Sequence, residues 1–335
     1  MKVLAIESTC DETAVAVVEQ DENGSLQVLS EAVASSASLH QKYGGIVPEV
    51  AAREQVRAMI PVIREGLGNI KIAEIGAVAV SNGPGLMGSL LVGVETAKVL
   101  AYSWKKPLIK VNHMAAHVAA NWINRVQRPV LPAIGLVVSG GHTDLIYLKD
   151  WQNWEWIGGT RDDAVGEAFD KVARILGLPY PGGPEIQKLV KEDTGEMEEK
   201  IKLPRPMIHE NNLEMSFSGL KAAVSKEYEA SNKSQRVVRE IAIEFNRAVV
   251  EVLIKKTMMA MDQYKCESLV VAGGVAANEE LRSALTQVVD KERLYFPELK
   301  YCGDNAAMVA AAAILRPNLI EIKDLKPEPG METVD

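Results

Sequence analysis

The sequence is poor in cysteine and in long apolar runs, and each shortage excludes a class of protein. Three cysteines, Cys10, Cys266 and Cys302, are scattered over 335 residues without a CxxC pair. This argues against a disulfide scaffold and predicts a reducing, cytoplasmic compartment. The longest apolar run, AAMVAAAAIL near residue 310, is far too short to span a bilayer. The opening MKVLAIEST meets Glu7 after four apolar residues, so we do not expect it to be a secretory signal.

Positive charge is also in short supply. Lysine and arginine number 37 against 45 aspartates and glutamates, a net charge of -8. A free-standing nucleic-acid binder is usually basic, so any RNA contact must use a local patch or the charge of a partner. One candidate patch holds Lys105, Lys106, Lys110, Arg125 and Arg128, with a merely solvated surface as the alternative. The hydrophobic fraction of 47% is ordinary for a soluble globular protein.

Two common enzyme motifs are missing. The sequence has no P-loop, which argues against a Walker ATPase. The stretch VNHMAAH carries His113 and His117 four positions apart, as in a zinc-protease helix. Such a protease needs a glutamate directly after the first histidine, and Met114 stands there instead. A protease reading is therefore disfavoured.

The same order of predicted elements occurs twice along the chain. In the first half three strands, KVLAIEST, TAVAVVEQ and LQVLSEAVAS, precede a helix over residues 47–67 and the buried strand IGAVAVS. In the second half AIGLVV, TDLIYLKD and WEWIGG precede the helix DAVGEAFDKVARILG and the strand SLVVA. This repeat predicts a duplicated α/β fold of two lobes with an active-site cleft between them, the architecture of actin-like ATPases and sugar kinases.

The expected boundaries follow from this repeat. Residues 1–128 form the N-terminal lobe, joined by a C-terminal helix within 305–335, and residues 129–304 form the second lobe. Charged helical sequence over about 190–240 is expected to be an insertion. The last stretch, 316–335, carries three prolines and is expected to be a loose tail.

The histidine pair suits metal binding by its spacing. A helical wheel places His113 and His117 about 40° apart, away from an apolar stripe that includes Val111, Met114 and Val118. Two imidazoles at i and i+4 can chelate one ion. A third ligand, expected to be a carboxylate, must come from elsewhere. Two unrelated polar histidines remain the alternative at this point.

Glycine-rich turns and isolated carboxylates supply the other candidates. Glycine pairs occur in NGPG (82–85), SGGH (139–142), PGGP (181–184) and AGGVAAN (272–278), where backbone N–H groups could approach phosphates or simply form turns. The candidate carboxylates are Asp11, Asp170 and Asp304. Asp304 stands just before a helix, so an N-cap role is the alternative for it. Asp11 could equally be a turn residue.

A family resemblance covers residues 3 to 316. Its motifs are ESTCDETAVAV, GGIVPEVAAREQ, SNGPGLMGSLLVGVETAK, VNHMAAH, LVVSGGHTDL, DDAVGEAFDKVARILGLPYPGGP, FSGLKAAV, AGGVAANEELR and YCGDNAAMVA, in this order. On these motifs the chain closely resembles the tRNA N(6)-adenosine threonylcarbamoyltransferase family, formerly called O-sialoglycoprotein endopeptidases, and CDET, VPEVAAR and SGGHT resemble its bacterial branch. The resemblance implies transfer of threonylcarbamoyl from threonylcarbamoyl-adenylate to N6 of adenosine 37 in tRNAs reading ANN codons.

The resemblance also implies a site. It implies that His113, His117 and Asp304 hold one metal ion, Fe²⁺ or Zn²⁺, and that Asp11 and Glu12 matter for catalysis. It implies that one group of residues contacts the substrate: Val137, Val138, Ser139, Gly140 and Gly141. A second group is implied to bind the nucleoside of the adenylate, or of an ATP- or ADP-like nucleotide: Asp170, Gly183 and Asn278. The family pattern is not met at Gln187, where many relatives have aspartate, or at Gly303, where threonine is common.

The partners implied are tRNA, a smaller actin-like paralogue forming a heterodimer, and a small P-loop ATPase of the same complex, with no membrane. Two alternatives stay open. One is a non-catalytic scaffold paralogue, which would lack the histidine pair. The other is an ATPase or kinase of the same fold, in which His113 and His117 would have no role.

Overall fold

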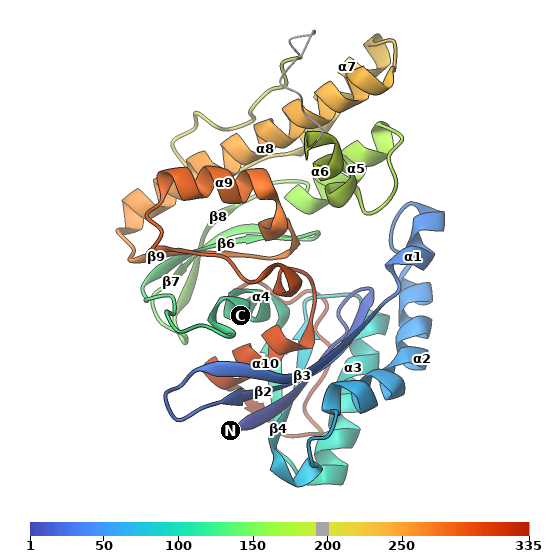
Figure 1. The fold of residues 1–335 in the computed structure, drawn as a ribbon, viewed down its shortest axis with the longest axis vertical. Helices are drawn as coiled ribbons and strands as arrows, with labels where there is room; N and C mark the ends of the chain where they lie inside the picture. The colour runs from blue at the N-terminus through green and yellow to red at the C-terminus, as the bar shows by residue number, and fades with distance from the viewer. Residues whose placement is uncertain (192–200, 335) are drawn as a thin grey trace. The chain divides into compact units, whose positions relative to one another are not determined.

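The computed structural model describes residues 1–191 and 201–334. It contains two compact units, each built around one β-sheet (Figure 1). The first unit consists of Met1–Pro129, Asp150–Asn153 and Phe296–Asp335, and the second of Val130–Lys149 and Trp154–Tyr295. Within the described ranges no helix has both the length and the apolarity to cross a membrane.

The first unit is a six-stranded sheet with helices on both faces. Its order is β11-β5-β4-β1-β2-β3, in which β1 pairs antiparallel with β2 and parallel with β4. The strands are β1 (Lys2–Glu7), β2 (Glu12–Gln20), β3 (Leu26–Ser35), β4 (Ile75–Gly83), β5 (Leu108–Asn112) and β11 (Leu319–Ile320). The helical segments are α1 (Ala37–His40), η1 (Gln41–Tyr43), α2 (Pro48–Leu67), η2 (Ile72–Glu74), α3 (Met87–Trp104), α4 (His113–Ala119), η3 (Ala120–Trp122), η5 (Leu299–Tyr301) and α10 (Ala306–Leu315).

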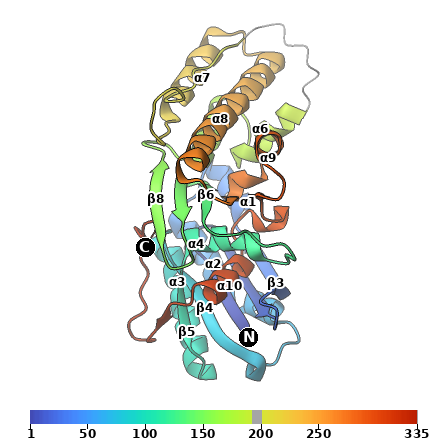
Figure 2. The same ribbon diagram turned by 90° about the vertical axis from the view of Figure 1, so that its left-hand side faces the viewer.

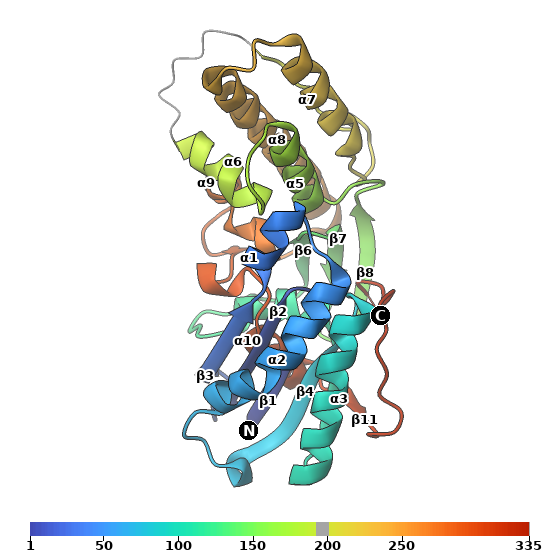
Figure 3. The ribbon, with the colours of Figure 1, turned by 90° about the vertical axis from the view of Figure 1, so that its right-hand side faces the viewer.

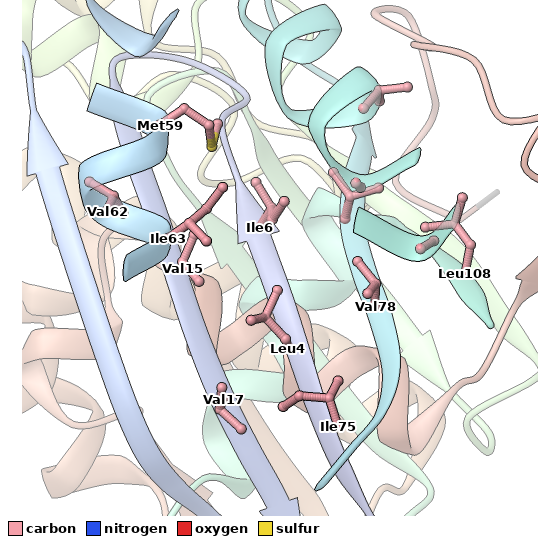
Figure 4. Close-up of a cluster of buried hydrophobic side chains, with 14 of the residues drawn as sticks. Leu4, Ile6, Val15, Val17, Met59, Val62, Ile63, Ile75, Val78 and Leu108 are labelled. Atoms are coloured by element: carbon pink, nitrogen blue, oxygen red, sulfur yellow. The ribbon is translucent and has the colours of Figure 1, made fainter. Parts of the chain in front are cut away.

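The two faces of this sheet carry side chains of different size. The central strands are buried on both faces, as their continuous apolar runs require. Leu4, Ile6 and Val15 point towards α2 and α3, where Met59 and Ile63 pack on them (Figure 4). Helices α2 and α3 cover this face (Figure 3), whereas the alanine-rich α10 covers the opposite one (Figure 2). Small residues on both sides let α10 approach the sheet closely and pack against α4.

The histidine helix α4 begins directly after the parallel strand β5. Asn112 caps it, because its Oδ1 accepts hydrogen bonds from the N–H groups of Met114 (2.8 Å) and Ala115 (3.2 Å). Every residue of α4 is buried. The helical wheel predicted that His113 and His117 lie outside the core, and this prediction is wrong. Both side chains are buried, because α10 and the sheet enclose α4.

The second unit repeats the sheet topology of the first. Its order is β10-β9-β6-β7-β8, so β9-β6-β7-β8 matches β4-β1-β2-β3 in both sequence order and direction. The strands are β6 (Ala133–Val138), β7 (Thr143–Leu148), β8 (Trp154–Gly159), β9 (Ser268–Ala272) and β10 (Leu294–Tyr295). The helical segments are α5 (Val165–Ile175), α6 (Gly182–Lys191), α7 (Ser218–Ala230), α8 (Gln235–Tyr264), η4 (Gly274–Ala277) and α9 (Glu279–Val288). The duplication read from the sequence is thus present.

The expected insertion over about 190–240 is only partly described. Residues 192–200 lie outside the described residues, and α7 with the start of α8 accounts for the helical remainder.

The C-terminal stretch is not the loose tail that its prolines suggested. Strand β11 pairs antiparallel with β5, and Leu325 is fully buried in the core of the first unit. The Glu328 N–H donates to the carbonyl of Asn82 (2.7 Å). Prolines end helices but do not prevent an extended segment from packing along a sheet edge. The return to the first unit comes at Phe296, earlier than the expected boundary after 304, so Asp304 belongs with the histidines.

Candidate functional site

Three side chains of the first unit converge on one point. His113 and His117 face the same side of α4, with ring centroids 4.6 Å apart. Asp304, from the loop before α10, places its Oδ1 3.6 Å from His113 Nε2 and 3.2 Å from His117 Nε2. One ligand atom from each residue lies within 4.8 Å of the others. The packing of α10 on α4 brings together residues that are nearly two hundred positions apart.

The donor set and its spacing fit a metal ion. Two imidazole nitrogens and a carboxylate oxygen suit Zn²⁺ or Fe²⁺. Ligands about 2.1 Å from a tetrahedral ion lie about 3.4 Å from one another, and the two distances to Asp304 Oδ1 lie on either side of that value. His117 is 1% exposed, and its Nε2 lies beside the Asp304 carboxylate, as it would if both residues held one ion.

Asp304 is not the N-cap of the helix that follows it. Asn305 caps α10 instead, with its Oδ1 accepting from the Met308 N–H at 2.9 Å. The Asp304 carboxylate is therefore left for the histidines, and its side chain is 21% exposed. A side chain at Gly303 would meet no atom within 4 Å, so the departure from threonine there relieves no steric conflict.

A fourth residue of this centre, Glu7, was not among the candidates from the sequence. Glu7 is fully buried at the end of β1. It accepts hydrogen bonds from the Thr9 N–H (2.7 Å) and the Ser81 hydroxyl (2.6 Å), and its Oε2 lies 3.0 Å from His113 Nδ1. The available signal was a lone carboxylate ending an otherwise apolar buried strand, since a buried charge needs a partner.

Charges at the centre stabilise one another. Burial alone would raise the pKa of Asp304, but His113 and His117 outweigh it and lower that pKa to about 2. Burial would lower the pKa of His113, but the carboxylates of Glu7 and Asp304 raise it to about 9. Burial would likewise raise the pKa of Glu7, and the charge and hydrogen bond of His113 bring it below its ordinary range. In the metal-free protein, both ring nitrogens of His113 therefore carry a proton at neutral pH, and the ring is positively charged.

The turn between β1 and β2 carries the two predicted catalytic carboxylates. Asp11 is largely buried, and its carbonyl accepts hydrogen bonds from the N–H and hydroxyl of Ser36 (3.0 and 2.9 Å). Burial, followed by the charges of Asp304 and Asp11, raises the pKa of Glu12 to about 9. Glu12 is thus a neutral acid at pH 7, with Ser35 donating to it at 3.1 Å.

A buried glutamine, also missed from the sequence, fixes this turn. The Gln55 side-chain amide donates to the carbonyls of Ser8 (3.3 Å), Cys10 (3.0 Å) and Glu12 (3.0 Å). Helix α2 thereby holds the backbone that presents Asp11 and Glu12. No sequence pattern distinguishes Gln55 from other polar residues of an amphipathic helix.

The predicted substrate contacts at the end of β6 lie in the second unit. Val137 and Val138 bury their side chains in the sheet, so these side chains are not available to a ligand. Ser139, Gly140 and Gly141 follow in the turn, where a Cβ on either glycine would meet nothing within 4 Å. Gly273, after the adjacent parallel strand β9, has φ +91° and a hypothetical Cβ only 2.4 Å from the Val138 carbonyl. Glycine is required there by the close approach of the two strand ends.

The three predicted nucleoside contacts also lie in the second unit. Asp170 Oδ1 accepts from the Gly182 N–H (2.7 Å) at the start of α6, next to Gly183. Asn278 caps α9 by accepting from the Leu281 N–H (3.0 Å), and its amide donates to Asn246 (2.7 Å). Asp170 and Asn278 therefore each organise a helix start. Gly183 has open space where a side chain would be.

Comparison with solved structures identifies the fold. HypF of T. kodakarensis aligns with 94% of this chain and 47% of its own, at a TM-score of 0.59 and 14% identity. Together with the two matching sheets, this similarity confirms the duplicated α/β fold of the actin-like ATPase and sugar-kinase class.

Sequence comparison identifies the family. The profile described as tRNA N6-adenosine threonylcarbamoyltransferase matches residues 27–311. A protein of that name from Moorella thermoacetica is 47% identical over 317 residues, covering 93% of this chain and 90% of its own. The Bacillus subtilis protein of the same name is 43% identical over 341 residues, covering 99% and 96%. The chain belongs to the tRNA N6-adenosine threonylcarbamoyltransferase family.

Proposed function

We propose that this transferase moves threonylcarbamoyl from threonylcarbamoyl-adenylate to N6 of adenosine 37 in tRNAs reading ANN codons. The observation that carries the proposal is the buried His113–His117–Asp304 cluster in a chain of this family. The donor is a mixed anhydride of a carbamic acid and a phosphate, so it arrives activated. N6 attacks the carbamoyl carbon, the bond to the phosphate oxygen breaks, and AMP leaves.

The metal centre would be held by Nε2 of both histidines and Oδ1 of Asp304. A bound Fe²⁺ or Zn²⁺ supplies Lewis acidity for orienting and polarising the acyl donor. Asp11 is proposed to accept the proton released from N6, at the turn that Gln55 fixes. Burial raises the pKa of Glu12 in the metal-free protein, and in its protonated form this carboxyl would donate a hydrogen bond to a carbonyl or phosphate oxygen.

The second unit is proposed to bind the adenylate. Backbone groups of Val137, Val138, Ser139, Gly140 and Gly141 would contact the substrate, because N–H groups of a glycine-rich turn suit an anion. Asp170, Gly183 and Asn278 would shape the nucleoside site, which an ATP- or ADP-like nucleotide could also fill. Since Asn278 uses both ends of its amide internally, its contribution is to hold the start of α9 in place.

Partner proteins are proposed because of one exposed apolar face. Val56 and Ile60 on α2, with Met87, Leu91 and Tyr102 on α3, are all exposed although α2 and α3 pack together. A helix pair with an apolar outer face suits another helix pair, as a smaller actin-like paralogue in a heterodimer would provide. The net charge of -8 supports help with tRNA from such partners, including a small P-loop ATPase. The three cysteines form no disulfide among the described residues, which suits a cytoplasmic setting.

The alternatives explain less of the structure. A non-catalytic scaffold would have no use for a buried His/His/Asp cluster. An ATPase or kinase of the same fold would leave His113 and His117 without a role.

The deciding experiment supplies the purified chain with threonylcarbamoyl-adenylate, tRNA and its partner proteins, and quantifies threonylcarbamoyladenosine by nucleoside mass spectrometry. Wild type should modify the tRNA and carry about one transition-metal ion per chain, because the described residues contain one His/His/Asp cluster. His113→Ala and His117→Ala should lose both activity and metal. His209→Ala, an exposed histidine of the second unit, is the matched control and should lose neither. Full activity of the double histidine variant would refute the metal-assisted mechanism.

A further inference from the structure

Glu7 is a buried carboxylate whose partners are two neutral donors and one imidazole. The Thr9 N–H donates to Oε1, and the Ser81 hydroxyl donates to Oε2. Thr9 lies in the turn after β1 and Ser81 lies in β4, so both donors hold the carboxylate in place independently of the histidine. Register supports this, since β1 pairs parallel with β4 and β4 pairs parallel with β5, which leads into His113. The ends of three neighbouring strands thus meet at this carboxylate.

We infer that Glu7 is a positioning residue that keeps the proton of His113 on Nδ1 and thereby presents Nε2 to the metal ion. An ionised carboxylate only accepts hydrogen bonds. The ring nitrogen 3.0 Å from Oε2 must therefore be an N–H, so once an ion has displaced the other ring proton the lone pair lies on Nε2. That nitrogen is the one that faces Asp304 Oδ1. The inference rests on the metal centre proposed above.

His117 has no carboxylate hydrogen-bonded to its Nδ1 among the described residues. Nδ1 of His117 is buried and has no hydrogen-bond partner in the part of the chain that the structure describes. His113 is thus the anchored ligand, and its ring orientation is set before an ion arrives. Thr9 adds a weaker contact, with its hydroxyl 3.4 Å from His113 Nδ1. Partners of this kind fix the tautomer and raise the basicity of a ligating imidazole.

The negative charge of Glu7 is a second reason to assign this residue to the metal centre. A divalent ion in a buried site is stabilised when nearby anions balance its charge. Asp304 alone supplies one negative charge among the three ligands. Glu7 supplies the second through the hydrogen bond to His113, so the centre becomes neutral with the ion bound.

The test is the zinc affinity of the metal-free full-length protein, measured by competition with a chromogenic chelator. Glu7→Gln keeps the shape but loses the charge, and its amide can donate to Nδ1, which favours the wrong tautomer. We expect its affinity to fall about 10- to 100-fold. Glu7→Asp keeps the charge but withdraws it from Nδ1, and should also weaken binding. Glu244→Gln, another buried glutamate but in the second unit, is the matched control and should bind as wild type.

The outcomes separate the two proposals. Wild-type protein that binds no zinc refutes the metal centre itself. Wild-type protein that binds one ion while folded Glu7→Gln binds equally well overturns the role of Glu7 alone, and unchanged affinity in Glu7→Asp shows that charge suffices without positioning.

A measurement on the wild type covers the case in which the variants do not fold. Nitrogen-15 spectra of the zinc-loaded protein should show His113 protonated on Nδ1 and ligating through Nε2, with the resonance assigned by its absence in His113→Asn. Ligation through Nδ1 would contradict the inference.

Discussion

Protons and metal ions compete for Nε2 of His113. In the metal-free protein the carboxylates of Glu7 and Asp304 hold the pKa of this histidine at about 9. An ion binding at pH 7 must therefore displace a proton, and one displaced proton changes apparent affinity about tenfold per pH unit below that pKa. Zinc affinity should thus rise about 100-fold between pH 7 and pH 9 and then level off.

The stability of the metal-free protein should move in the opposite direction. A histidine whose pKa is raised on folding stabilises the native state fully below its ordinary pKa of 6.5, and this stabilisation is lost as pH rises through about 9. The shift corresponds to about 3 kcal/mol. Glu12, whose pKa is raised from 4.5 to about 9, makes stability depend on pH in the same direction. Its contribution to stability is complete below pH 4.5 and is lost as the pH rises through about 9.

Two measurements check this pair of effects. Chelator competition from pH 6.5 to pH 9.5, corrected for protonation of the chelator, gives the slope of zinc affinity. Urea unfolding of the metal-free protein over the same range gives its stability. His113→Asn removes the titrating imidazole and should make the fall in stability between pH 7 and 9 less steep, with the remaining slope due to Glu12. A wild-type zinc affinity that does not change with pH below 8 would refute the proposed charge coupling of His113 with Glu7 and Asp304.

Three further changes test other parts of the structure. Gln55→Leu removes the amide that holds the turn before β2 and should lower the free energy of unfolding in urea by about 1–3 kcal/mol. The variant should keep its metal but lose transfer activity, and full activity would contradict the role of Gln55 in fixing the turn. Leu325→Ala should cost about 2–5 kcal/mol, because this residue is fully buried, and a melting temperature equal to wild type would mean that the C-terminal stretch is dispensable. Leu91→Glu places a charge on the exposed face of α2 and α3 and should abolish heterodimer formation in size-exclusion chromatography while leaving zinc affinity unchanged; an intact heterodimer would locate the partner elsewhere.

The parts of the fold that follow from short-range patterns were predictable from the sequence. Continuous apolar runs such as VLAI and AVAV marked the buried strands, and their repeated order in both halves indicated the duplication. The C-terminal stretch was mispredicted because proline content reports on helices, whereas its packing depends on Leu325 and on pairing with β5.

The residues of the candidate site also divide into those that the sequence predicted and those that only the structure reveals. The i,i+4 spacing of His113 and His117 indicated a chelating pair, and the family motifs supplied Asp304. Glu7 and Gln55 could not be found in this way, because their partners lie 106 and up to 47 positions away in the chain. Only the neighbouring ends of parallel strands and the packing of α2 bring them into contact.

The sequence by itself therefore determined the repeated α/β pattern, the histidine pair and the family, since each is carried by residues close together or by ordered motifs. The tertiary structure decided which groups complete the centre. It frees Asp304 by giving the cap of α10 to Asn305, and it places Glu7 behind His113. The physical reason is that a buried charge is stable only beside its partners, and those partners are chosen by strand order and helix packing rather than by sequence proximity.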